Sequence, residues 1–144
     1  MSVEENKAFE RRLYEEIYIR KNSAAIEQFF ATNWVCHPSP PGMPSGLKGM
    51  KQWHDLNNKA IPDMQVKLED MVAEGDKVAC RWTATGTHEG EFMGVPATNK
   101  QISLSGIHID LITSGKVAET WNYSDMLGVM QQLGVIPSMG KNKR

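Results

Sequence analysis

Hydrophobic residues follow two different periods along the chain, one typical of helices and one typical of strands. In residues 3 to about 20, aromatic and apolar side chains recur at helical spacing: Phe9, Leu13, Tyr14, Ile17 and Tyr18. Acidic residues stand at the start of this segment and basic residues at its end, as the helix dipole favours. We therefore expect a helix here and a second short helix in residues 21–31. A third is expected over residues 47–61, closed by Pro62, which cannot extend a helix.

From residue 63 onward, apolar and polar side chains alternate, and this pattern predicts strands. The expected strands are residues 33–37, 64–75, 77–88, 100–112 and 116–124, and a short helix is expected over residues 125–134. Helices grouped ahead of long antiparallel strands predict one α+β domain that spans residues 1–144. A strongly curved antiparallel sheet wrapped over the N-terminal helices would form a cone, and pockets form in such open mouths.

The segment "GIHIDLITSGKVAETWNYSD", residues 106–125, has the alternation of a β-hairpin. We read residues 113–115 as a three-residue loop with Gly115 in the left-handed conformation, which places His108 opposite Thr120. A two-residue turn is the alternative, and it would pair His108 with Trp121. In the first register one face carries His108, Asp110 and Asn122, because side chains alternate between the two faces.

The opposite face of this hairpin is largely apolar, with Ile107, Ile109, Leu111, Val117, Glu119, Trp121 and Tyr123. An apolar face of this size needs a cover, and we expect either the helices or a second subunit to supply it. The polar face is then either exposed to solvent or the lining of a pocket.

Composition narrows the classes of function. Hydrophobic residues make up 40% and charged residues 23% of the chain, and the net charge of −1 argues against an electrostatic nucleic-acid binder. The sequence has neither a signal peptide nor an apolar run long enough to span a membrane, so we expect a cytoplasmic protein. Cys36 and Cys80 lack metal-ligand spacing, which favours two buried free thiols and no metal.

Four ordered motifs carry a family resemblance: "GDKV", "GTHEGEFMGVPATNKQI", "SGKVAETWNYSD" and "LGVMQQLG". With these motifs the chain resembles the SnoaL-like polyketide cyclases, a branch of the NTF2-like superfamily, over about residues 10 to 137. The resemblance implies an NTF2-like α+β cone that forms a homodimer or homotetramer. It also implies closure of a ring in an aromatic polyketide ester by intramolecular aldol condensation, without metal or organic cofactor.

The resemblance assigns the catalytic His to His108. It places the acid/base Asp directly after Trp121, where this chain has Asn122, and an amide cannot take up a proton at neutral pH. Asp110 and Asp125 remain as candidate bases, although Asp125 also suits the N-cap of the last helix. Four residues are candidate aromatic walls or rims for a planar ligand: Trp34, His37, Trp82 and Trp121.

Three functional hypotheses follow. The first is a cyclase that acts on a small hydrophobic carbonyl compound by acid/base chemistry, in which His108 orients or protonates and Asn122 donates a hydrogen bond. The second is a protein that binds a small ligand without chemistry, or a lyase, isomerase or hydrolase on the same fold, since a fold alone does not fix an activity. The third is a dimerisation module whose cone is filled by side chains.

Overall fold

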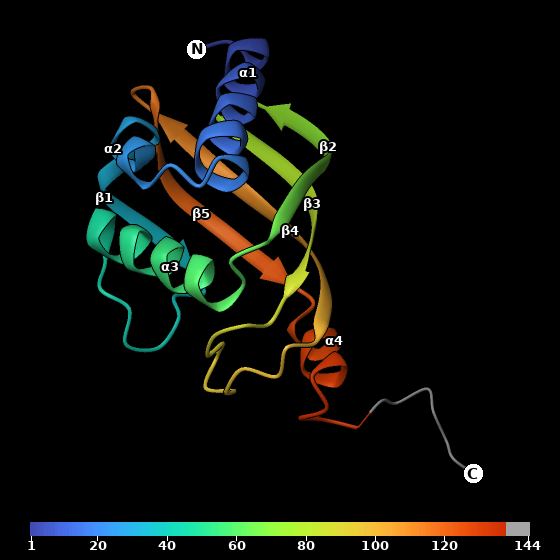
Figure 1. Ribbon diagram of the computed structural model, residues 1–144. Coiled ribbons are helices and arrows are strands. Elements are labelled where there is room, and N and C mark those ends of the chain that lie inside the picture. Colours follow the sequence, from blue (N-terminus) through green and yellow to red (C-terminus); the bar gives the residue numbers. More distant parts are fainter. Residues whose placement is uncertain (138–144) are drawn as a thin grey trace.

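The protein was analysed as a computed structural model, which describes residues 1–137. Helices cover one face of a five-stranded sheet (Figure 1). The helical elements are α1 (Val3–Leu13), the π-helix η1 (Tyr14–Ile19), the 3₁₀ turn η2 (Ser23–Ala25), α2 (Ile26–Phe29), α3 (Gly46–Ala60) and α4 (Met126–Gln132). The strands are β1 (Phe30–His37), β2 (Gln65–Glu74), β3 (Lys77–Thr87), β4 (Gln101–Thr113) and β5 (Lys116–Ser124). The predicted α+β class is confirmed.

The first helix begins at a capping box. Ser2 Oγ accepts a hydrogen bond from the backbone N–H of Glu5 (3.1 Å), and Glu5 Oε1 accepts one from the N–H of Ser2 (2.8 Å). After Leu13 the helix continues in the wider turns of η1, in which the N–H of Arg20 donates to the carbonyl of Glu15 (2.9 Å). The predicted helix over residues 3 to about 20 is therefore present, with its last third in π-helical form.

The sheet is mixed rather than wholly antiparallel. Its order is β1-β5-β4-β3-β2, and all neighbours are antiparallel except β1 and β5. The expected strand at residues 33–37 begins earlier, at Phe30, because the second helix is only four residues long. β1 and β2 lie at opposite edges of the sheet, and the chain crosses from one to the other through α3 (Figure 1). β1 is therefore not paired with the strand that follows it, and it runs parallel to β5.

The β4–β5 hairpin corrects the expected register. Ser114 and Gly115 form a two-residue turn, and both have positive φ (53° and 76°), as type I′ hairpin turns require. His108 lies opposite Asn122, which differs from both sequence-based registers. A bulge at Ala118 adds one residue to β5, since Leu111 pairs with Glu119 while Ile112 pairs with Val117. Because of this extra residue, His108 and Asn122 still share one face of the sheet. A two-residue turn without the bulge would have placed them on opposite faces.

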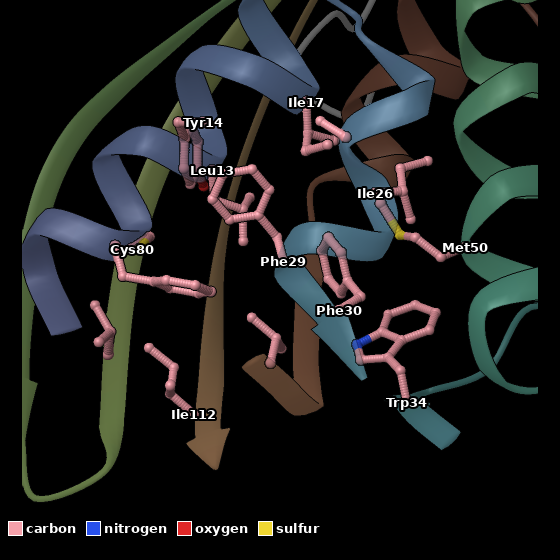
Figure 2. Close-up of a cluster of buried hydrophobic side chains, with 14 residues drawn as sticks. Leu13, Tyr14, Ile17, Ile26, Phe29, Phe30, Trp34, Met50, Cys80 and Ile112 are labelled. Atoms are coloured by element: carbon pink, nitrogen blue, oxygen red, sulfur yellow. The ribbon is translucent and has the colours of Figure 1, made fainter. Parts of the chain in front are cut away.

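The hydrophobic core fills the space between the helices and the inner face of the sheet. Figure 2 shows Leu13, Phe29 and Phe30 packed toward one another, with Ile112 of β4 lying below them in this view. A second, smaller cluster lies toward α4 and contains Ala60, Ile61, Phe92, Ile102, Val129 and Leu133.

The helices cover the sheet face that carries His108 and Asp110, and they leave the apolar hairpin face open. On that outer face Ile107 is 51% exposed and Tyr123 is 67% exposed. Of the two covers expected for this apolar face, the helices are excluded, because the polar side chains are the ones that point toward them, and a second subunit remains. Within the described residues, none of the helices combines the length and apolarity that a membrane crossing needs.

Candidate active site

A cluster of ionisable side chains lies buried between α1 and the inner face of the sheet. β4 supplies His108 and Asp110, which share this face because they are two residues apart on a strand. α1 supplies Glu10. The exposed fractions are 0% for Glu10, 6% for His108 and 2% for Asp110. Nε2 of His108 lies 3.5 Å from Oδ2 of Asp110 and 3.9 Å from Oε2 of Glu10.

A chain of hydrogen bonds fixes the carboxylate of Asp110. Thr120, which is opposite Asp110 on β5, donates its hydroxyl hydrogen to Oδ1 of Asp110 (2.7 Å). The indole N–H of Trp34 on β1 in turn donates to the hydroxyl oxygen of Thr120 (2.9 Å). Three strands thus hold this carboxylate in one orientation, with its second oxygen directed toward His108.

The helical layer contacts the other side of the imidazole. Tyr14, on the first turn of η1, stacks on His108 with ring centroids 5.6 Å apart and an interplanar angle of 22°. Its hydroxyl lies 3.3 Å from Nδ1 of His108. The thiol of Cys80 on β3 points to Glu10, with Sγ 3.8 Å from Oε2. These contacts leave the imidazole little freedom to rotate.

The electrostatics of the cluster favour a charged imidazole. Burial alone would lower the pKa of His108, but the negative charge of Asp110 and the hydrogen bonds to Asp110, Cys80 and Glu10 together outweigh burial and hold this pKa well above its ordinary value of 6.5. Burial works to raise the pKa of Asp110, yet the charge of His108 and the hydrogen bonds from Glu10 and Thr120 lower it. Burial and the neighbouring charge of Asp110 raise the pKa of Glu10 well above 4.5. These shifts favour a charged His108 paired with the Asp110 carboxylate, and they make Glu10 the more readily protonated of the two carboxyl groups.

The same cluster contains the atoms that could approach a metal ion. Three potential ligand atoms lie within 4.8 Å of one another, one from each of Glu10, Cys80 and His108. Burial raises the pKa of the Cys80 thiol to about 11, so a metal ion would have to displace the thiol proton to bind there. Both ring nitrogens of His108 already have partners, Nε2 with Asp110 and Nδ1 with the Tyr14 hydroxyl, so the imidazole fits a hydrogen-bonded cluster better than a metal centre.

Three further sequence-predicted site residues share the inner face with His108 and Asp110. Asn122 lies directly opposite His108 on β5 and is half-buried. Trp82 lies beside Gly106, where a Cβ would be only 2.6 Å from the indole ring, so glycine permits this close approach. Trp34 also points inward, but as the hydrogen-bond donor to Thr120.

The remaining predicted residues lie elsewhere. Asp125 is exposed, and its Oδ1 accepts a hydrogen bond from the N–H of Gly128 (2.9 Å), so it caps α4. His37 and Trp121 stack on each other on the outer face, with centroids 5.4 Å apart. Nε2 of His37 lies 2.6 Å from Oε2 of Glu119. The structure does not bring these three residues to the cluster.

The middle of the inner face is accessible between the two core clusters. Along β4, Ile102 and His108 are buried, whereas Leu104 and Gly106 between them are half-buried. Together with Trp82 and Asn122 they form what we call the accessible stretch of the inner face. Two hollows of about 520 and 440 Å³ lie outside this region, between α1 and α2 and between η2 and α3, and neither contains a residue of the cluster.

Glu10 and Tyr14 were not among the residues that the sequence singled out for chemistry. Glu10 lies on the same helical face as Leu13 and Ile17, and a charged residue inside that apolar stripe was the available signal. Thr120 and Cys80 carried no such signal, because their roles depend on neighbouring strands that are distant in sequence.

Comparisons with known proteins agree with this architecture. The family model described as SnoaL-like polyketide cyclase matches residues 10–133. The aklanonic acid methyl ester cyclase DnrD of Streptomyces peucetius is 33% identical over 72 residues, which are 49% of this chain and 50% of that protein. The nogalonic acid methyl ester cyclase of Streptomyces nogalater is 29% identical over 72 residues, 49% of this chain and 54% of that protein. These matches span about half the length of the curated relatives.

Solved structures match over more of the chain. TsrD from Streptomyces laurentii superposes with a TM-score of 0.82 at 29% identity, covering 90% of this chain and 97% of that one. AclR from Streptomyces galilaeus gives a TM-score of 0.83 at 31% identity, covering 97% and 87% respectively. The chain therefore belongs to the SnoaL-like polyketide cyclase family.

Proposed function

We propose that this protein binds a small hydrophobic carbonyl compound, of the polyketide ester kind, along the accessible stretch of the inner face. His108 then acts as the acid that donates a proton to a carbonyl oxygen of this compound. Asn122, opposite His108, donates a hydrogen bond to the same or a neighbouring oxygen. The observation that carries the proposal is the buried His108–Asp110 pair, which faces inward next to the accessible stretch.

An intramolecular aldol closure needs a proton to be taken up at one step and given back at another, and a single imidazole can do both. A proton leaves the acidic carbon, a carbon–carbon bond forms, and the carbonyl oxygen that is attacked ends with a proton. The neutral form of the His108 imidazole first takes the proton from the acidic carbon. The charged imidazole that results then donates this proton to the oxygen of the carbonyl group that has been attacked. Asp110 stabilises the charged form through its buried carboxylate, and no external acid or base is consumed.

One observation favours a second candidate, a binding protein without chemistry. Asn122 stands where the family resemblance places the acid/base Asp. The carboxyl groups of Glu10 and Asp110 both contact His108 inside the cluster, and Asp110 also accepts a hydrogen bond from Thr120. In that case His108 and Asn122 would bind carbonyl oxygens through hydrogen bonds alone. A ligand would then bind to a saturable site and leave unchanged.

The test is turnover of aklanonic acid methyl ester and nogalonic acid methyl ester, the compounds named for the cyclase relatives. We expect the wild type to convert at least one of them and His108→Ala to be about 100-fold slower or worse, the usual effect of losing a general acid. His37→Ala, a histidine on the outer face, is the matched control and should keep the wild-type rate. Equal rates for wild type and His108→Ala would remove His108 from the chemistry, and saturable binding without conversion would favour the binding protein.

A further inference from the structure

Glu10 occupies a position where a lone carboxylate would be very costly. It is 0% exposed, and it lies on α1, which packs against β2 and β3. Its Oε2 approaches His108 and Cys80, whereas its Oε1 has no hydrogen-bond partner. A buried charged carboxylate with one oxygen unpaired would lose most of its hydration energy without replacement. A neutral carboxylic acid in the same place would leave only a carbonyl oxygen unpaired, which costs much less.

The closeness of Glu10 and Asp110 points to the same protonation state. Both carboxyl groups lie against Nε2 of His108, with Oδ2 of Asp110 at 3.5 Å and Oε2 of Glu10 at 3.9 Å. Two carboxylates beside one imidazole nitrogen repel each other and neither has a hydrogen to donate, whereas a protonated carboxyl group can donate to the other. None of the ion pairs within residues 1–137 brings a Lys or Arg to either group, and His108 is the cation paired with them.

The other titratable groups around the pair do not change this balance of charges. Tyr14 and Tyr18 from η1 and Cys36 and Cys80 from β1 and β3 all have pKa values raised by burial, so they are uncharged at neutral pH. A charged His108, a charged Asp110 and a neutral Glu10 therefore give the cluster no net charge.

We propose that Glu10 is a positioning residue of the site, which stays protonated at neutral pH and donates its hydrogen to Asp110. The Glu10–Asp110 pair then carries one negative charge, matched to the one positive charge of His108. This arrangement fixes the imidazole between the helix and the sheet in its proton-donating form. The inference rests on the proposed function for the role of His108, but the protonation of Glu10 can be measured without any substrate.

Infrared spectroscopy of the protein in D₂O tests the proposal directly, because a protonated carboxyl group absorbs apart from carboxylates. At neutral pH we expect this band in the wild type and its loss in Glu10→Gln, whose amide keeps the size of the side chain. Glu15→Gln, which changes an exposed glutamate on η1, is the matched control and should retain the band. A wild type without the band, or a band that persists in Glu10→Gln, would overturn the proposal.

Isotope labelling of the wild type keeps the test decisive if Glu10→Gln does not fold. Incorporation of glutamate with ¹³C in its carboxyl carbon should shift the protonated-carboxyl band to lower frequency. A band that shifts with labelled aspartate and not with labelled glutamate would place the hydrogen on Asp110 and contradict the assignment.

Unfolding measured against pH gives an independent readout. The pKa of Glu10 is raised in the folded state, so its contribution to the free energy of unfolding is complete below its ordinary pKa of 4.5. This contribution is lost as the pH rises through the raised value. Glu10→Gln cannot ionise, so across that range its unfolding should be linked to about one proton fewer than that of the wild type. Equal proton linkage in the two proteins would also overturn the proposal.

Discussion

Asp110 carries a negative charge in a place almost without water, and its partners are the imidazole of His108 and the hydroxyl of Thr120. The attraction between two opposite charges is strong in such surroundings, but so is the loss of hydration for each charge. The pair is therefore sensitive to the removal of one member, because the remaining charge has no water to replace it. This sensitivity distinguishes the His108–Asp110 pair from the ion pairs on the surface.

The first residue-scale prediction concerns Asp110→Asn. We expect it to lower the free energy of unfolding by about 3–5 kcal/mol, the typical effect of breaking a buried pair. Asp70→Asn breaks a surface pair with Arg81, whose side chains are half-exposed or more, and should have little effect. Urea denaturation of the three proteins measures the difference. If the two variants were equally stable, the His108–Asp110 pair would not be a buried ion pair.

A second residue-scale prediction concerns Asn122→Asp. This change restores the carboxylate that the family resemblance places after Trp121, on the inner face and opposite His108. If the protein is a cyclase, an added base should increase the turnover of the two methyl esters by about 10-fold or more. If the rate stays the same or falls, a carboxylate at this position does not act as a base in this protein.

At the scale of secondary-structure elements, the sequence predicted which segments are helices and strands better than how they pair. Alternation correctly grouped His108 and Asp110 on one face of β4, since it depends only on the period of a strand, but it left open whether that face points inward. The turn type and the bulge at Ala118 were missed, because a tight turn with a compensating bulge leaves the alternation nearly unchanged. The contribution of Glu10 was also missed, because it requires the docking of α1 on the sheet, which local patterns do not specify.

The element-scale prediction concerns the start of α4. Asp125→Ala removes the side chain that caps this helix, and we expect it to cost about 1 kcal/mol of stability. Turnover, where the wild type shows it, should be unaffected because Asp125 is exposed and its carboxylate is engaged in capping α4. Denaturation and the ester assay on the same sample measure both quantities. A loss of turnover without a loss of stability would restore Asp125 as a candidate base.

At the scale of the whole molecule, the outer face of the sheet lacks a cover within the described chain. It presents Ile107, Ile109 and Tyr123 beside the stacked pair of His37 and Trp121. An apolar area of this kind is unusual on a monomer in water. We propose that a second copy of the chain covers it, so that the protein is a homodimer or a homotetramer.

Analytical ultracentrifugation tests this proposal. We expect the wild type to sediment as an oligomer and the double variant Ile107→Glu/Tyr123→Glu to sediment as a monomer, because each change places a charge in the apolar interface. Glu74→Gln, an exposed change at the end of β2, is the control and should leave the assembly unchanged. A wild type that is monomeric at high concentration would contradict the proposal.

An NMR titration of the His108 imidazole in the wild-type protein tests the charged His108–Asp110 pair most directly. Nitrogen chemical shifts distinguish the charged ring from its two neutral forms. We predict that His108 carries both ring hydrogens at neutral pH and loses one only as the pH rises well beyond its ordinary pKa of 6.5, because Asp110 stabilises the charged form. A His108 that is already neutral at pH 7 would contradict the charged His108–Asp110 pair and, with it, the proposed proton donor.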